Sequence, residues 1–236
     1  MMSRAKSPFL VRLALVSAIL LLLQGCKPSS RSGLNVEKPI PVSSPSPTPA
    51  AQATPPPKLP PPTQAQVEEA FRRIFGDAMS AHAADRQTYV VGDFNGDQSE
   101  DLAILARPAP GKLGDVNGDL ANWIILDADK AFIPPTDKTV VVPPRQTPAK
   151  LADGEEVLAI IHGFGPQGWR TPDARQAYLI KHAAATILGI APSASQKYIR
   201  SLNLHLDTEI IREVRNNRKG YLFWTGSVYA WHPSEG

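Results

Sequence analysis

The stretch VVGDFNGDQSEDLAIL, residues 90–105, places two apolar runs on either side of a loop crowded with acidic residues. Short apolar runs that flank a turn rich in Asn, Gly and Asp are typical of neighbouring β-strands. The sequence therefore predicts a hairpin with strands over residues 88–91 and 101–106. Carboxylates this close repel one another at neutral pH, so we also expect something positive to bind in the loop.

Further short apolar or β-branched runs follow the hairpin, and turn residues separate them. They predict strands over residues 123–126, 140–142, 156–162, 177–181 and 209–214, and a hairpin over residues 220–231 around Thr225 and Gly226.

Two segments carry helix signals. Thr63 and Gln66 form a capping-box pattern ahead of an amphipathic helix, and Thr171-Pro172-Asp173 reads as the start of a second, short helix. Few long helical crossovers separate the strands, which favours antiparallel pairing. The predicted fold class is α+β and β-dominated, a mainly antiparallel sheet with one N-terminal amphipathic helix.

Residues 1–25 have the pattern of a signal peptide, a basic start followed by an apolar run. The run ends in Leu23-Gln24-Gly25-Cys26, which resembles the lipobox of bacterial lipoproteins. The resemblance implies cleavage before Cys26, acylation of its thiol with chains such as palmitate, and a lipid anchor in the cell-envelope membrane. Lys27 after the cysteine favours the outer membrane if the cell is Gram-negative. The alternative is an ordinary signal peptide with a chance cysteine.

Residues 26–62 join the lipidated cysteine to a proline-rich tether that contains half of the 24 prolines of the chain. Proline fixes φ and removes a donor, so this segment favours extended polyproline II over a packed core. We therefore expect one globular β-rich domain over residues 63–236, held away from the membrane.

The charge balance excludes a nucleic-acid partner. The chain carries a formal charge of +3, but Arg4, Lys6 and Arg12 lie in the signal peptide, so the mature chain is neutral (3 − 3 = 0). Nucleic-acid binding needs a basic surface that neutralises phosphates. Cys26 is the single cysteine, which excludes an internal disulfide and a cysteine zinc cluster.

The acidic loop has the residue types and spacing of a calcium site. Asp93, Asn95, Asp97 and Asp101 occupy positions 1, 3, 5 and 9, and Ser99 at position 7 can offer its carbonyl oxygen. Calcium takes six to eight oxygen ligands in irregular geometry. The alternative is an acidic loop whose Asn and Asp serve turn chemistry alone.

The sequence GDFNGD, residues 92–97, with the following DLAI, residues 101–104, resembles the calcium loop of FG-GAP and VCBS repeats. That resemblance implies a structural calcium ion between two strands. The family has glycine at position 6 of the loop, where this chain has Gln98. A non-glycine residue is strained there if the position needs positive φ.

Three other patterns are weaker. Asp115, Asn117 and Asp119 repeat the opening of the acidic loop without its later ligands, so whether they bind an ion stays open, and a polar turn is the simpler interpretation. Residues 163–168, GFGPQG, match GxGxxG, but Pro166 stands where a Rossmann helix would continue, which favours a plain glycine-rich loop. The five histidines show no metal-ligand spacing.

Two functions are compatible with these patterns. The first is a non-enzymatic envelope lipoprotein with a calcium-stabilised domain, which binds or scaffolds an envelope or extracellular protein. The second is an exported hydrolase with a dispersed active site near His162. An acid hydrogen-bonded to His162 beside an oxygen-lined cleft would favour the hydrolase.

Overall fold

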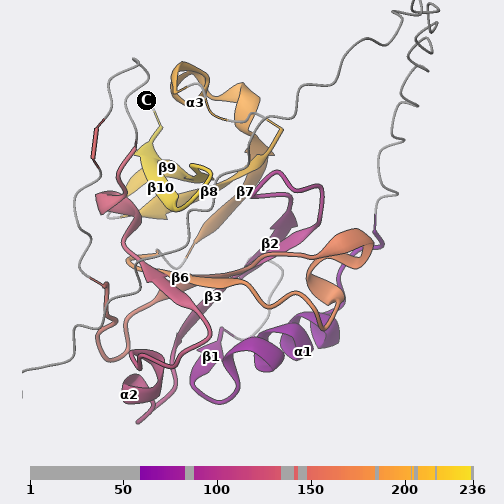
Figure 1. The fold of residues 1–236 in the computed structure, drawn as a ribbon, viewed down its shortest axis with the longest axis vertical. Helices are drawn as coiled ribbons and strands as arrows, with labels where there is room; N and C mark the ends of the chain where they lie inside the picture. The colour runs from indigo at the N-terminus through magenta and orange to yellow at the C-terminus, as the bar shows by residue number, and fades with distance from the viewer. Residues whose placement is uncertain are drawn as a thin grey trace, which may run out of the picture. The chain divides into compact units, whose positions relative to one another are not determined.

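The computed structural model describes residues 59–82, 88–133, 141–142, 148–183, 186–202, 204, 207–215 and 217–234. Cys26 and most of the tether lie outside these residues. Within the described part, ten strands form two sheets, and three α-helices and three 3₁₀ segments accompany them (Figure 1). None of the described helices has the length and apolar character that crossing a bilayer requires.

The first sheet has the strand order β1-β3-β5-β6-β4, and β2 also pairs with β3. All of its pairs are antiparallel except β4 with β6, which is parallel. Its strands are β1 (Met79–Ala81), β2 (Tyr89–Gly92), β3 (Asp101–Pro108), β4 (Ile124–Leu126), β5 (Val157–Ile161) and β6 (Ala177–Ile180).

The second sheet is antiparallel throughout, with the order β10-β9-β8-β7. Its strands follow one another along the chain, and although short turns join β8 to β9 and β9 to β10, residues 193–208 separate β7 from β8. They are β7 (Ile187–Pro192), β8 (Glu209–Arg215), β9 (Arg218–Trp224) and β10 (Tyr229–Pro233).

The helix α1 (Gln64–Phe75) begins at the predicted capping box: the Thr63 N–H donates to the Gln66 side chain over 3.0 Å, and the Gln66 N–H donates back to the Thr63 hydroxyl. It ends at Gly76, whose φ of 57° suits glycine. The shorter helical segments are α2 (Leu113–Val116), η1 (Ala128–Lys130), η2 (Gly165–Arg170), η3 (Ser193–Ser195) and α3 (Lys197–Ser201).

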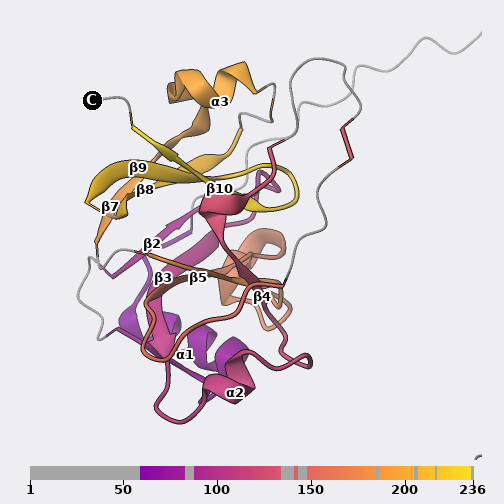
Figure 2. The ribbon, with the colours of Figure 1, turned by 90° about the vertical axis from the view of Figure 1, so that its left-hand side faces the viewer.

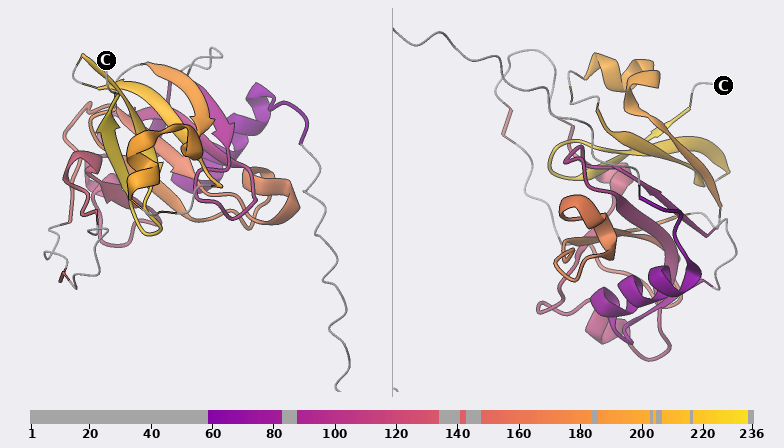
Figure 3. Two further views of the ribbon diagram at one scale, coloured as in Figure 1. Left: turned by 90° about the horizontal axis from the view of Figure 1, so that it is seen from above. Right: turned by 90° about the vertical axis from the view of Figure 1, so that its right-hand side faces the viewer.

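The two sheets and the helices stack in four layers (Figures 2 and 3). Alternation along β3 explains the order, because Leu102 and Ile104 pack with α1 on one face, whereas Ala103 and Leu105 pack toward the second sheet on the other. A third apolar cluster joins the far side of the second sheet to α3. The first sheet is therefore covered on both faces, which is why its central strands read as continuous apolar runs.

The predicted fold class, α+β with mainly antiparallel sheet and one amphipathic N-terminal helix, is confirmed. The helix predicted at Thr171-Pro172-Asp173 is wrong, because these residues form a turn in which the Ala174 N–H donates to the Thr171 carbonyl oxygen. Strands β1 and β7 and the helix α3 were not predicted. Of the strand predicted over 140–142, residue 140 lies outside the described residues, and Val141 and Val142 are in no strand.

Candidate metal centre

The acidic loop, residues 93–100, joins β2 to β3, whose last antiparallel pair is Gly92 with Asp101. Two loop residues have left-handed backbones, Gly96 with φ of 80° and Gln98 with φ of 68°. Position 6 of the loop therefore does adopt the conformation that favours glycine, and Gln98 carries a strain of about 1 kcal/mol there.

Side chains of the loop hold its backbone in place. Asp93 accepts the N–H groups of Gly96 over 2.7 Å and of Gln98 over 2.9 Å. Asp97 accepts the Ser99 N–H over 2.8 Å. Each carboxylate oxygen has two lone pairs, so these bonds still leave acceptor capacity for a cation.

Asp101 is the most deeply buried of the predicted ligands, with none of its surface exposed. Its two oxygens accept the N–H of Phe94, within the acidic loop, over 2.8 Å and the N–H of Gly163, in a second loop, over 2.7 Å. The residue predicted as the fourth side-chain ligand thus also clamps two loops together.

That second loop is the glycine-rich segment 163–168, and it packs directly on the backbone of Glu100. A Cβ at Gly163 or Gly168 would overlap the Glu100 carbonyl oxygen, and the Trp169 N–H donates to that oxygen over 2.8 Å. The Glu100 carboxylate pairs with the Arg170 guanidinium. Gly163 and Gly168 of the GxGxxG pattern therefore serve close packing, whereas Gly165 has open space around it.

In the part of the chain that the structure describes, the three carboxylates of the site have no basic partner. Among the described residues, no lysine or arginine forms an ion pair with Asp93, Asp97 or Asp101. Burial, with a smaller contribution from the charge of Asp97, raises the pKa of Asp93. Burial and the two neighbouring carboxylates raise the pKa of Asp101 well above its ordinary value. A cation in the loop would relieve both costs.

A chain of hydrogen bonds leads from the loop into the space between the sheets. The Asn95 amide oxygen accepts the Asp97 N–H, and its nitrogen donates to the Asp97 carboxylate, which fixes the orientation of the amide. The same nitrogen lies 3.2 Å from Nδ1 of His162, so Nδ1 must accept. His162 therefore carries its proton on Nε2, which lies 2.7 Å from the Tyr229 hydroxyl oxygen.

His162 follows β5 directly and is 2 % exposed. Its ring packs against those of Tyr178, at 4.9 Å between centroids, and Trp224, at 5.2 Å. Burial lowers its pKa to about 4, so the ring is neutral at pH 7. Its partners among the described residues are amide and phenol groups, not the carboxylate that the hydrolase hypothesis required.

The second acidic loop is built differently. The Asn117 side chain accepts the Leu151 N–H over 2.8 Å and donates to the Leu151 carbonyl oxygen over 3.0 Å, so it pairs with backbone as a neighbouring strand would. Asp115 lies 3.4 Å from the ammonium of Lys112, and Asp119 is exposed. Asp115 thus lies in α2, the Asn117 side chain is occupied by the Leu151 backbone, and Asp119 lies in the turn that follows.

The donor set of the first loop suits a hard cation. Its carboxylate, amide and carbonyl oxygens are the ligands that calcium prefers, and Asn95 and Ser99 belong to it besides the acids. In the described part of the chain, no three His, Cys, Asp or Glu side chains converge on one point. A calcium ion would therefore need Asn95 or backbone oxygens in its coordination sphere.

The acidic loop has a neighbour in the second sheet that the sequence did not predict, Glu209 at the start of β8. The Glu209 carboxylate accepts the Asp93 N–H over 3.1 Å, and the Glu209 N–H donates to the Asp93 carbonyl oxygen over 2.7 Å. Glu209 lies more than a hundred positions away and belongs to no motif, so no local signal could have identified it. The role of His162 as a partner of Asn95 was equally invisible.

Comparison with family models, with characterised proteins and with solved structures finds no match to this chain. The resemblance of the loop to FG-GAP and VCBS repeats stays a prediction.

Proposed function

We propose that this protein is a lipid-anchored lipoprotein of the bacterial cell envelope whose β-rich domain is stabilised by calcium. Asp93, Asn95, Asp97 and Asp101, with the carbonyl oxygen of Ser99, would hold the ion. Its role there is structural: it supplies the positive charge that the loop lacks and fixes the end of the β2–β3 hairpin.

One observation carries the calcium part: the carboxylates of Asp93, Asp97 and Asp101 lie within nine residues and have no basic partner among the described residues, and the pKa values of Asp93 and Asp101 are raised. Such a loop is costly without a cation. The clamp between Asp101 and Gly163 joins this loop to the glycine-rich loop, so an ion would steady both.

We assign the domain a binding or scaffolding role because His162, the histidine of the hydrolase hypothesis, has a structural role. Both ring nitrogens of His162 are hydrogen-bonded and its surface is buried, so substrate has no route to it in this arrangement. General-base catalysis needs a ring nitrogen within reach of the substrate proton.

A thermal melt in calcium and in chelator tests the ion. Calcium at a hundred times its dissociation constant adds about 2.7 kcal/mol, which raises Tm by roughly 5–10 °C for a domain of this size. Asp97→Ala should abolish the rise. Asp119→Ala removes the corresponding carboxylate from the look-alike second loop and should leave it intact. Coincident melts of the unmodified protein in calcium and chelator would refute the calcium site.

The anchor has a separate test. Metabolic labelling with palmitate should mark the protein and bring it to the membrane fraction, and Cys26→Ser should abolish both. Labelling that persists in Cys26→Ser would show that the lipobox resemblance is misleading.

A further inference from the structure

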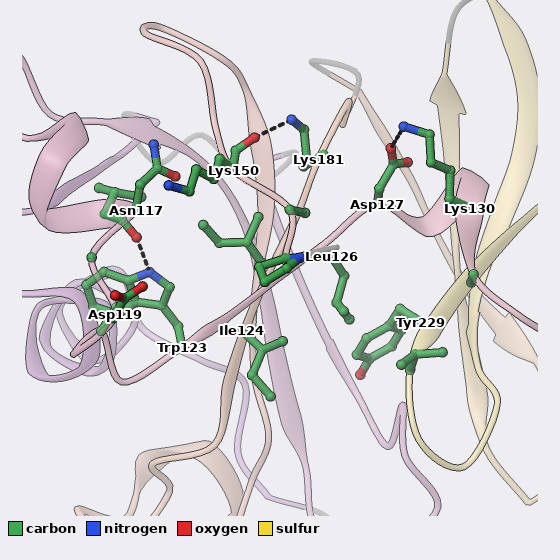
Figure 4. Close-up of a pocket in the computed structure, with 18 residues that line it drawn as sticks. Asn117, Asp119, Trp123, Ile124, Leu126, Asp127, Lys130, Lys150, Lys181 and Tyr229 are labelled. Atoms are coloured by element: carbon green, nitrogen blue, oxygen red, sulfur yellow. Dashed lines mark hydrogen bonds and ion pairs between the residues drawn. The ribbon is translucent and has the colours of Figure 1, made fainter. Parts of the chain in front are cut away.

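A cleft of about 850 Å³ runs along β4, at the open end of the first sheet, on the side away from β6. One end lies beside Trp123 and Lys150, the middle follows β4, and the other end reaches Lys130 and Tyr229 (Figure 4). Its size falls within the range of natural binding clefts, and its walls mix apolar with charged side chains as such clefts do.

The backbone of β4 leaves hydrogen-bonding groups facing this cleft. The Leu126 carbonyl oxygen accepts the Lys181 N–H over 2.9 Å, so Leu126 directs its backbone groups toward β6. Because these groups alternate in direction along a strand, the N–H and C=O of Ile125 point the other way. Among the described strands, none pairs with that side of β4.

An apolar side chain is also exposed at this edge, because Ile124 on β4 is 52 % exposed and lines the cleft. An edge strand with free backbone groups and exposed apolar neighbours attracts another strand unless it is protected.

Most charges of the cleft are already paired. Lys130 lies 2.9 Å from Asp127, and Lys181 lies 3.4 Å from Glu155, which is outside the lining. Two exposed lining residues, Lys150 and Asp119, form no ion pair among the described residues. Lys150 is therefore the cation of the cleft that a carboxylate of a ligand could pair with.

We propose that this cleft binds an extended segment of a partner protein, which adds to β4 as a further strand and places an acidic side chain against Lys150. Backbone bonds to Ile125 would supply affinity, and apolar side chains on Ile124 would fix the register. The cleft beside β4 would be the place where the proposed binding role is carried out. Binding there requires neither calcium nor the acidic loop.

The probe is a fluorescent heptapeptide, acetyl-TVEVEVT-amide, and binding is followed by anisotropy. Two isomers carry two N-methyl groups each on alternate residues, one at positions 3 and 5 and the other at positions 4 and 6. In a strand only one set of amides faces β4, so one isomer should lose about tenfold in affinity while the other binds like the parent. Equal behaviour of the two isomers, or no binding by the parent, overturns the proposal.

Two lysine variants with the same change of charge test the contact between Lys150 and a carboxylate of the peptide. Lys150→Glu should weaken the parent peptide about fivefold, whereas Lys197→Glu, on exposed α3 and outside the cleft lining, should leave it unchanged. Equal effects of the two variants would show that no specific charge contact exists. All titrations are run in calcium and in chelator, where equal affinities are expected, so a failed calcium site would not disturb this result.

Two other occupants would give different outcomes, and each overturns strand addition. Sodium decanoate that binds where the peptide does not would assign the cleft to small amphiphiles. A dimer that forms without peptide and is dissociated by Ile124→Glu would assign it to a second copy of the chain.

Discussion

Replacement of Asp101 by alanine separates its clamping role from its role as a predicted ligand. The carboxylate satisfies two backbone N–H groups, those of Phe94 at 2.8 Å and Gly163 at 2.7 Å, in a place without solvent access. A buried donor left without a partner costs roughly 1–3 kcal/mol. Two such donors would cost about twice that, but the change also removes a buried charge whose pKa is raised, which offsets part of the loss.

We therefore expect Asp101→Ala to lower the free energy of unfolding by about 2–3 kcal/mol and Tm by roughly 4–12 °C. The measurement is urea unfolding in chelator, so that no ion contributes to the difference. Asp101→Asn keeps one accepting oxygen and should lie between the wild type and the alanine variant. Asp97→Ala, at an exposed carboxylate of the same loop, should cost under about 1 kcal/mol in chelator.

A loss below about 0.5 kcal/mol for Asp101→Ala in chelator would refute this reasoning. It would mean that water reaches both N–H groups, or that the two loops hold together without the carboxylate. A large loss for Asp97→Ala under the same conditions would equally show that Asp101 has no special place in the loop.

Three further predictions concern the same region. Gln98→Gly should raise Tm by roughly 1–4 °C in a calorimetric scan, because it removes the left-handed strain, whereas Gln98→Ala should give no gain. Gly168 and Gly165 both have positive φ, but only at Gly168 would an added Cβ meet backbone atoms. In urea unfolding, Gly168→Ala should therefore lower the free energy of unfolding by at least about 2 kcal/mol more than Gly165→Ala does. Equal losses would exclude the close packing. Burial lowers the pKa of His162 from 6.5 to about 4. As the pH falls from 6.5 to about 4, the unfolded chain therefore binds a proton at this ring that the folded chain does not, and the free energy of unfolding decreases by about 3 kcal/mol. The difference in unfolding free energy between wild type and His162→Gln should shrink over that interval, and a constant difference would contradict it.

The elements of this fold that could be predicted are those with a local physical signal. Short apolar runs and the turn residues around 93–100 identify β2 and β3, because both signals lie within a few neighbouring residues. The capping box marks the start of α1 for the same reason: both of its bonds join residues three apart. Short elements without such signals, β1, β7 and α3, were not predicted. Pairing with other strands decides β1 and β7, and packing against the second sheet positions α3.

Local pattern also sufficed to place the acidic loop between β2 and β3, because both flanking runs lie next to it in the chain. The resemblance to FG-GAP and VCBS repeats marked Gln98 as the position where positive φ would strain the backbone, and its φ is 68°. The assignment of the loop residues as calcium ligands stays a prediction. Tertiary structure decided the rest. The pairing of Asp101 with Gly163, the contact of Asn95 with His162, and the cleft beside β4 each join segments that are far apart in the sequence. Hydrogen bonds and close packing act between groups a few ångströms apart in space, and no periodicity along the chain records which distant groups those are.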